Sequence, residues 1–202
     1  KTEEITCTTG SIVYGDGKCY SGSPTTVQPV GVVFDPTNKL ALALSDAGSA
    51  VRWAADYCDV SSLTNCTSLS TIMNCAIDGK TNTQALANNS CSTFPAAQNA
   101  THYNSSYCKE PFCQQGKWYL PSARDLNLIN SIRSMINESL TKAKGTTLSG
   151  SYWSSTEYNN IDAWKMTIGQ DMMSDDKVDI QAKVRPVVKY VLPSLDESGG
   201  GK

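Results

Sequence analysis

Eight cysteines constrain the fold of this 202-residue chain more than any other feature. Their number is even, and no two of them have the two-residue spacing of zinc knuckles and thioredoxin-type motifs. The single histidine, His102, leaves few ligands for a Cys/His metal site. We therefore expect disulfides and an extracellular or cell-surface location. The cysteines expected to form these bonds are Cys7, Cys19, Cys58, Cys66, Cys75, Cys91, Cys108 and Cys113.

The cysteines also indicate how the chain is organised. Cys7 and Cys19 flank a tight turn at Gly15-Asp16-Gly17, so we expect them to pair and to clip an N-terminal segment at residues 1–29. The other six allow fifteen pairings, and the sequence does not choose among them. Three of the six lie in residues 60–107, a stretch with only two charged side chains, and two more lie just outside it. Such a polar segment needs disulfides to order it.

Composition excludes several classes of protein. The chain has 17 basic and 19 acidic residues, a net charge of −2, and therefore no basic surface of the kind that binds nucleic acid. No apolar run approaches the roughly 18 residues that a membrane span needs. The chain begins at Lys1 without an initiator Met or a signal peptide, so we expect an anchor or stalk to precede it. Residues 191–202 are expected to form a tail, and no motif indicates a cofactor.

Apolar patterning predicts most of the secondary structure. Two apolar runs, residues 30–34 and 40–44, flank a turn-rich break and predict a hairpin. Short helices are expected at residues 81–87 and 95–103, the second with a proline in its first turn.

One long helix is expected at residues 122–144. Ser122 followed by Asp125 is a variant of the capping box, and Gly145 ends the helix. Apolar residues at spacings of three and four predict one buried stripe, made of Leu126, Ile129, Ile132, Ile136 and Leu140.

Two half-buried strands are expected near the C-terminus, at residues 164–168 and 178–184. In both, apolar and polar side chains alternate, the period of a strand with one buried face. A polar loop, residues 169–177, joins them. Pro186 puts the last strand of the chain at a sheet edge or a bulge, because proline cannot donate to a ladder.

Four short motifs in this half of the chain carry a resemblance to a known family. In this order they resemble the bacterial C-type-lectin-like domains of the Lcl C-terminal type, within the superfamily of formylglycine-generating-enzyme-like folds. Weaker variants upstream extend the resemblance over about residues 30–190. The motifs are Lys117-Trp118-Tyr119-Leu120-Pro121-Ser122, Tyr152-Trp153-Ser154-Ser155-Thr156-Glu157, Ala163-Trp164 and Val184-Arg185-Pro186-Val187.

The resemblance implies an α+β, C-type-lectin-like fold with small twisted antiparallel sheets, two or more helices and long disulfide-stapled loops. A ligand-binding domain would then occupy residues 30–190, with an insertion at about 58–113. Tryptophans in such a domain can serve as sugar platforms. We expect at least three of the four here to be core instead, since they supply large apolar area to a small core with few other aromatic residues.

In the resembling family, ligands meet the surface between the Trp153 strand and the final strand. The same segment of this chain mixes aromatic and methionine side chains with polar ones, as binding loops do. Within it, Met172-Met173 fits either a small satellite core or a soft contact surface. Its acidic residues have the oxygens that calcium needs but not the EF-hand spacing, so no metal is assigned. The residues expected to bind a ligand are Tyr158, Asn159, Asn160, Asp162, Lys165, Thr167, Gln170, Asp171, Met172, Met173, Ser174, Asp175 and Lys177.

Signatures of catalysis are missing. His102 has no acidic or nucleophilic neighbour in sequence, and no pair of carboxylates stands out as an acid/base couple. The calcium-dependent sugar triplets of lectins are absent. The oxidase branch of the superfamily uses an active-site cysteine pair, whereas the cysteines here lie mostly in the 58–113 insertion. We therefore expect a non-enzymatic protein.

Three hypotheses about function follow. The first is a surface or secreted recognition domain that binds a protein or glycan on another cell or host surface through residues 158–177. Some members of the resembling fold are variable proteins of diversity-generating retroelements, so this surface could be diversified. The second is a structural subunit of a surface appendage such as a minor pilin, assembled into a pilus. The third, an oxidase-branch enzyme, requires a reducible and accessible cysteine pair.

Overall fold

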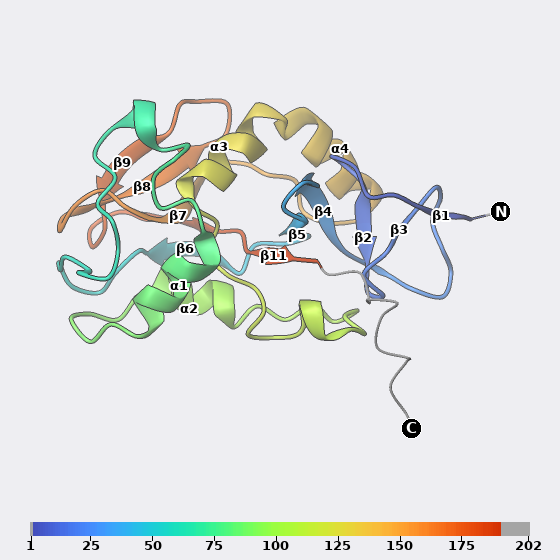
Figure 1. The fold of residues 1–202 in the computed structure, drawn as a ribbon, viewed down its shortest axis with the longest axis horizontal. Helices are drawn as coiled ribbons and strands as arrows, with labels where there is room; N and C mark the ends of the chain where they lie inside the picture. Colours follow the sequence, from blue (N-terminus) through green and yellow to red (C-terminus); the bar gives the residue numbers. More distant parts are fainter. Residues whose placement is uncertain (1, 191–202) are drawn as a thin grey trace, which may run out of the picture.

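The computed structural model describes residues 2–190, so the predictions for Lys1 and for the tail at 191–202 lie outside the described residues. The described chain forms two β-sheets and four α-helices, arranged along one long axis (Figure 1). The first sheet lies toward the N-terminal end, and the second sheet fills the opposite end (Figure 1). This confirms a mixed α+β fold.

The first sheet has six strands in the order β1-β3-β2-β4-β5-β11. The predicted hairpin is confirmed, since β4 and β5 pair in antiparallel fashion around the turn after Asp35. The carboxylate of Asp35 accepts hydrogen bonds from the backbone and side-chain nitrogens of Asn38, which fixes that turn. The strands are β1 (Glu4–Ile5), β2 (Ile12–Tyr14), β3 (Cys19–Tyr20), β4 (Pro29–Asp35), β5 (Leu40–Ala43) and β11 (Val187–Lys189).

The second sheet has five strands in the order β6-β10-β7-β8-β9. Its pairs are antiparallel as expected except for one, β10 with β7, which is parallel and makes this sheet mixed. The parallel pair arises because β10 returns after β9 and enters between β6 and β7. The strands are β6 (Gly48–Arg52), β7 (Ser151–Glu157), β8 (Asp162–Thr167), β9 (Met173–Asp176) and β10 (Gln181–Val184).

The C-terminal strands differ from the prediction for a physical reason. Residues 178–184 were expected to be one strand, but only Gln181–Val184 is extended. The Asp176 carboxylate accepts hydrogen bonds from the backbone N–H groups of Val178 and Asp179, at 2.8 and 2.7 Å, and so turns the chain there. The predicted polar loop at 169–177 in turn contains strand β9.

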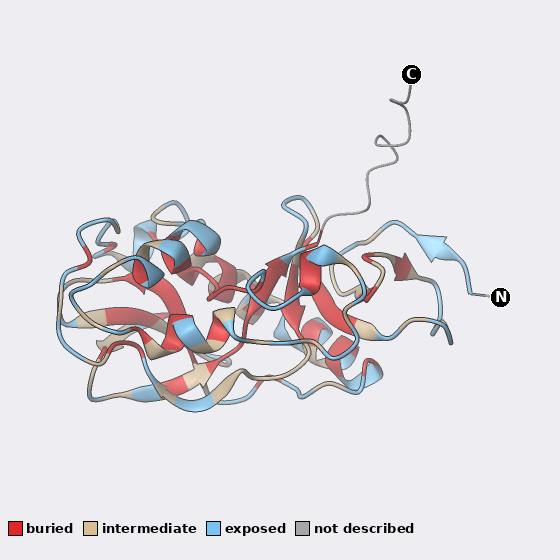
Figure 2. Cartoon of the chain, turned by 90° about the horizontal axis from the view of Figure 1, so that it is seen from below, coloured by how far each residue is buried: buried red, intermediate tan, exposed pale blue. Residues whose placement is uncertain are grey.

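Helices cover both faces of the second sheet. Helices α1 (Gly79–Ala87) and α2 (Pro95–Thr101) pack on one face, and α3 (Ala123–Ser131) packs on the other (Figure 1). Helix α4 (Arg133–Lys142) continues from α3 and contacts β4 of the first sheet. Buried residues therefore follow the strands and the inner helix faces, whereas β1 at the far end is exposed (Figure 2).

The predicted helix at 122–144 is two helices. Its capping box is confirmed, with the Ser122 hydroxyl accepting from the Asp125 N–H and the Asp125 carboxylate accepting from the Ser122 N–H. The helix breaks at Ile132, whose φ of −115° and ψ of 20° are not helical. Just before the break, the Ser131 hydroxyl donates to the carbonyl of Leu128 and competes with the helical hydrogen bonds. The stripe still packs inward, with Ile132 only half-buried.

All four tryptophans are buried, so the expectation that at least three are core is confirmed. Trp153 on β7 packs with α1 and α2 in one apolar cluster, whereas Trp164 on β8 packs with α3 in another. Each indole N–H donates to a backbone carbonyl; for Trp153 this is the carbonyl of Val51, at 2.7 Å. The tryptophans therefore join the sheet to its helices and offer no sugar platform.

Four disulfides link the loops, and the described residues contain no free cysteine. The predicted pair Cys7–Cys19 is confirmed. Of the fifteen pairings open to the other six cysteines, the structure selects Cys58–Cys91, Cys66–Cys75 and Cys108–Cys113.

The capping box gives a prediction for the pH dependence of stability. Burial raises the pKa of Asp125 to about 6, above its value in the unfolded chain. The folded state therefore holds this proton more tightly, and stability is lost as the pH rises through 6. We expect the wild-type protein to lose about 2 kcal/mol between pH 4 and pH 7 relative to Asp125→Asn, measured by urea unfolding. Equal pH slopes for the two proteins would contradict this.

Candidate functional site

The predicted ligand-binding residues lie at the end of the second sheet that is farthest from β1, on β8, β9 and their flanking loops (Figure 1). Antiparallel pairing places Asp162 opposite Asp176 and Lys165 opposite Met173. This register brings most of residues 158–177 into one surface, which we call the β8–β9 face. Its most exposed members among the predicted residues are Asn160, Gln170, Asp171 and Met173.

Two of the predicted residues do not belong to this face. Met172 is only 4% exposed and packs in the apolar cluster of α3 and β8, while Met173 is 44% exposed. The two methionines therefore divide between the two roles that the sequence left open. Lys177 was expected at the ligand surface, but its side chain is completely buried.

Lys177 is held by contacts from distant parts of the chain. Its ammonium group pairs with the buried carboxylate of Glu157, donates to the carbonyl of Cys58 at 3.0 Å and lies 4.8 Å from the ring centre of Trp53. Burial lowers the pKa of the Lys177 ammonium and raises the pKa of the Glu157 carboxyl. Because Glu157 lies 20 residues away in sequence, no local pattern indicated this ion pair. The pair lies beneath the β8–β9 face and supports it from the interior.

Several polar groups of the β8–β9 face are already engaged with one another. Lys165, expected to point outward, is half-buried and pairs with Asp175. The side-chain oxygen of Asn159 accepts from the backbone N–H groups of Ile161 and Asp162 and so closes the β7–β8 turn. Tyr158 packs edge-on against Trp164, with ring centres 5.5 Å apart. These residues shape the face more than they offer free hydrogen bonds.

An aromatic residue that the sequence analysis missed adds to this face. Tyr57, 49% exposed, donates to the carboxylates of Asp176 at 2.8 Å and Asp179 at 3.4 Å. The hydrogen bond to Asp176 raises the pKa of Tyr57 to about 12. Since Tyr57 lies about 120 residues before its partners, only the fold reveals the contact.

Exposed apolar side chains also collect here. Ile161 in the β7–β8 turn is 47% exposed, similar to Met173 and Tyr57. Among residues 2–190, no group of three or more His, Cys, Asp or Glu side chains is arranged to hold a metal ion. The β8–β9 face thus combines apolar contact area with carboxylates and amides, a composition that suits contact with another macromolecule.

Comparison with known proteins gives a likeness of fold. No protein-family model matches the sequence, and no curated protein matches it. Among solved structures, a fimbrial protein from Bacteroides ovatus matches with a TM-score of 0.62 and 19% sequence identity. The match covers 91% of this chain and 49% of that protein, so the chain spans about half of its length. At this identity the likeness concerns the fold. Within residues 2–190, no helix is both long and apolar enough to cross a membrane.

Proposed function

We propose that this chain is a non-enzymatic structural subunit of a surface appendage of the fimbrial type. The observation that carries the proposal is the likeness of nearly the whole chain to a fimbrial protein. Four disulfides fit an extracellular or cell-surface location, where an appendage subunit would act. The elongated arrangement of the two sheets suits end-to-end assembly, because it leaves strand β1 and the β8–β9 face at opposite ends (Figure 1).

The sheet edges determine which strands can contact a neighbouring subunit. Strand β10 lies between β6 and β7 and has no free edge for a neighbouring subunit. Strand β9 is an edge, yet it carries Asp175 and Asp176, and charged edge residues oppose pairing. Strand β1 is also an edge; both its residues are exposed, and Ile5 is apolar. We place the assembly contact at β1.

This placement predicts the effect of a charge at β1. Self-association of the purified chain, measured by analytical ultracentrifugation, should weaken at least about tenfold in Ile5→Lys, because a lysine on an edge strand disfavours pairing. The matched control is Leu69→Lys, which adds the same charge at a similarly exposed leucine in the short helix η1 (Leu69–Thr71), which is part of neither sheet. A chain that is monomeric throughout, or two variants with equal effects, would contradict the proposal.

Recognition of a protein or glycan ligand is the second candidate function. The observation that favours it is the group of exposed apolar residues Tyr57, Ile161 and Met173 beside the acidic residues of the β8–β9 face. The resemblance to C-type-lectin-like domains, with a surface open to diversification by a retroelement, supports the same candidate. It predicts that Ile161→Ser combined with Met173→Ser abolishes a signal on glycan or protein arrays while the fold persists. Unchanged array binding would exclude this face.

A further inference from the structure

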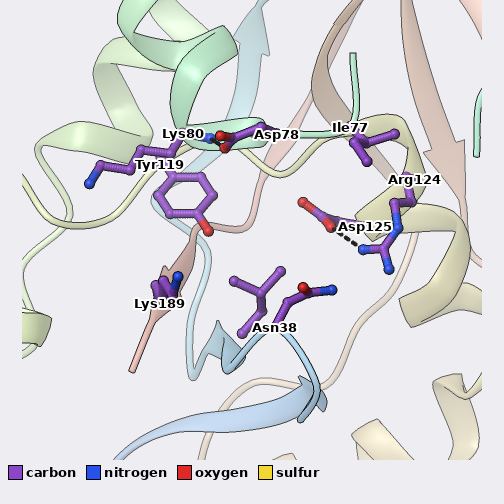
Figure 3. A pocket seen from close by; sticks show the side chains of 10 residues that line it. Asn38, Ile77, Asp78, Lys80, Tyr119, Arg124, Asp125 and Lys189 are labelled. Carbon is purple, nitrogen blue, oxygen red and sulfur yellow. Dashed lines mark hydrogen bonds and ion pairs between the residues drawn. The ribbon is translucent and has the colours of Figure 1, made fainter. Parts of the chain in front are cut away.

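A pocket of about 400 Å³ lies between the first sheet and the starts of helices α1 and α3, and it includes no residue of the β8–β9 face. The turn after β4, the first turns of α1 and α3, and strand β11 form its walls (Figure 3). This volume is in the range of sites that bind small molecules. Its lining residues are Asn38, Leu40, Ile77, Asp78, Gly79, Lys80, Tyr119, Arg124, Asp125 and Lys189.

Tyr119 is the group that most strongly indicates a ligand. Its side chain is only 6% exposed, and its hydroxyl points into the pocket between Lys189 and Asp125 (Figure 3). Within residues 2–190 this hydroxyl makes no hydrogen bond to the protein, unlike the indole N–H groups of the core, and it is open to the pocket rather than sealed from solvent. Burial of the ring, together with the nearby carboxylates of Asp125, Asp78 and Asp35, raises the pKa of Tyr119, so the group stays a neutral donor. A ligand in the pocket can therefore replace water as the hydrogen-bond partner of this hydroxyl.

The acceptors around the pocket are already engaged. The Asp78 carboxylate caps helix α1 by accepting from the backbone N–H groups of Lys80 and Thr81. The Asp125 carboxylate accepts from the Ser122 N–H and from the guanidinium of Arg124. These carboxylates therefore stabilise the protein and have little capacity left to bind the hydroxyls of a neutral ligand.

The donors, in contrast, are available. Arg124 is neutralised by Asp35, whose carboxylate accepts from both terminal nitrogens of the guanidinium at 3.0 Å. Lys80 at the rim and Lys189 on β11 have no ion-pair partner among the described residues. Together with the Tyr119 hydroxyl, they give the pocket free donors, while its charges balance, since Lys80, Arg124 and Lys189 are matched by Asp78, Asp125 and the Asp35 that pairs with Arg124. Free ammonium and hydroxyl donors favour a ligand with acceptor oxygens, and a carboxylate accepts the strongest hydrogen bonds of this kind.

The pocket is built on rigid elements. Gly79 lets the start of α1 approach the 119–122 segment, since a Cβ there would lie 2.7 Å from the carbonyl oxygen of Leu120 and 3.2 Å from the ring of Tyr119. Ile77, 46% exposed, and Leu40 add an apolar wall. The wall can pack against the carbon atoms of a ligand whose charged end meets Tyr119 and Lys189.

We propose that this pocket binds a small organic carboxylate. The carboxylate accepts hydrogen bonds from the Tyr119 hydroxyl and the Lys189 ammonium group, and the carbon framework lies against Ile77 and Leu40. A uronic acid and a simple cyclic acid share this chemistry, so the experiment distinguishes these two sources.

The test is calorimetric titration of the purified chain in about 0.15 M salt, where long-range attraction is screened. The probes are glucuronate, glucose as its neutral counterpart, and cyclohexanecarboxylate, which has the carboxylate and the ring size without the hydroxyls. We expect glucuronate to bind at least tenfold more tightly than glucose. Binding of cyclohexanecarboxylate as well would identify any small carboxylate as the ligand, and its failure would identify an acidic sugar.

Variants separate this site from nonspecific charge attraction. Tyr119→Phe removes one hydroxyl that stabilises nothing else in the described chain, and Lys189→Gln removes one charge. Each should weaken glucuronate binding about tenfold or more, because hydrogen bonds to a charged group are strong. The control Lys117→Gln removes an equal charge from an exposed residue outside the pocket and should have no effect. Equal binding of glucose, no binding of either acid, or full binding by Tyr119→Phe would overturn the proposal.

Discussion

Replacing Lys177 by methionine should destabilise the protein by about 3–5 kcal/mol. The substitution leaves the Glu157 carboxylate buried with its partner removed, and the Val60 N–H then remains its hydrogen-bond donor, at 3.3 Å. Urea unfolding at pH 7 measures the loss. The matched control is Lys142→Met, which breaks the exposed Glu138–Lys142 pair on α4 and should change stability little, because solvent screens that pair.

The pH dependence of the stability of Lys177→Met tests whether the unpaired Glu157 carboxylate causes the loss. Without the ammonium group, burial raises the pKa of Glu157 further above its unfolded value. Stability is then present at low pH, where the carboxyl is protonated, and is lost as the pH rises through the folded pKa. Relative to the wild-type protein, we expect Lys177→Met to be destabilised more at pH 8 than at pH 5. Adding Glu157→Leu to Lys177→Met should recover much of the lost stability. A loss no larger than that of Lys142→Met would contradict the buried pair.

Removing the disulfide Cys58–Cys91 should cost about 4 kcal/mol. Its cysteines are 33 residues apart, so the bond restricts a long loop in the unfolded chain. The bond Cys108–Cys113 spans only five residues, and its removal should cost about 2 kcal/mol by the same reasoning. The measurement compares the free energies of unfolding of the two double Cys→Ala variants with that of the wild-type protein.

The comparison tests whether Cys58–Cys91 orders the polar stretch that precedes α2. This segment supplies Tyr57 to the β8–β9 face and Trp53 to the contact with Lys177. The Cys58/Cys91 variant should therefore also show faster hydrogen exchange at residues 54–64. A larger loss of stability on removal of Cys108–Cys113 than on removal of Cys58–Cys91 would contradict this role of Cys58–Cys91.

Local chemistry explains which features the sequence could predict. The Ser122–Asp125 capping box and the hairpin of β4 and β5 depend on neighbouring residues, and both are found as expected. The break at Ile132 was missed, because the apolar spacing continues through it while the Ser131 side chain interrupts the backbone bonding. The prediction of a strand over all of residues 178–184 was wrong for a similar reason. Hydrogen bonds to the Asp176 carboxylate turn the chain there, and the alternation of apolar and polar residues does not reveal them.

Long-range contacts explain most of what the sequence could not predict at the site. Asn160, Gln170, Asp171 and Met173 are exposed on the β8–β9 face, and their role in binding a ligand stays a prediction. Lys177 looked like another loop residue, because its partner on β7 becomes a neighbour only after the sheet has formed. The pocket at Tyr119 unites four separate segments, so no motif could indicate it.

Immunogold electron microscopy of intact cells that produce the protein, with antibodies against the folded chain, tests most directly whether the chain is built into a surface appendage. We predict gold label along filaments or at their tips, and transfer of the label to the filament fraction when the cells are sheared. Label that stays on the cell body after shearing, with none in the filament fraction, would contradict the claim.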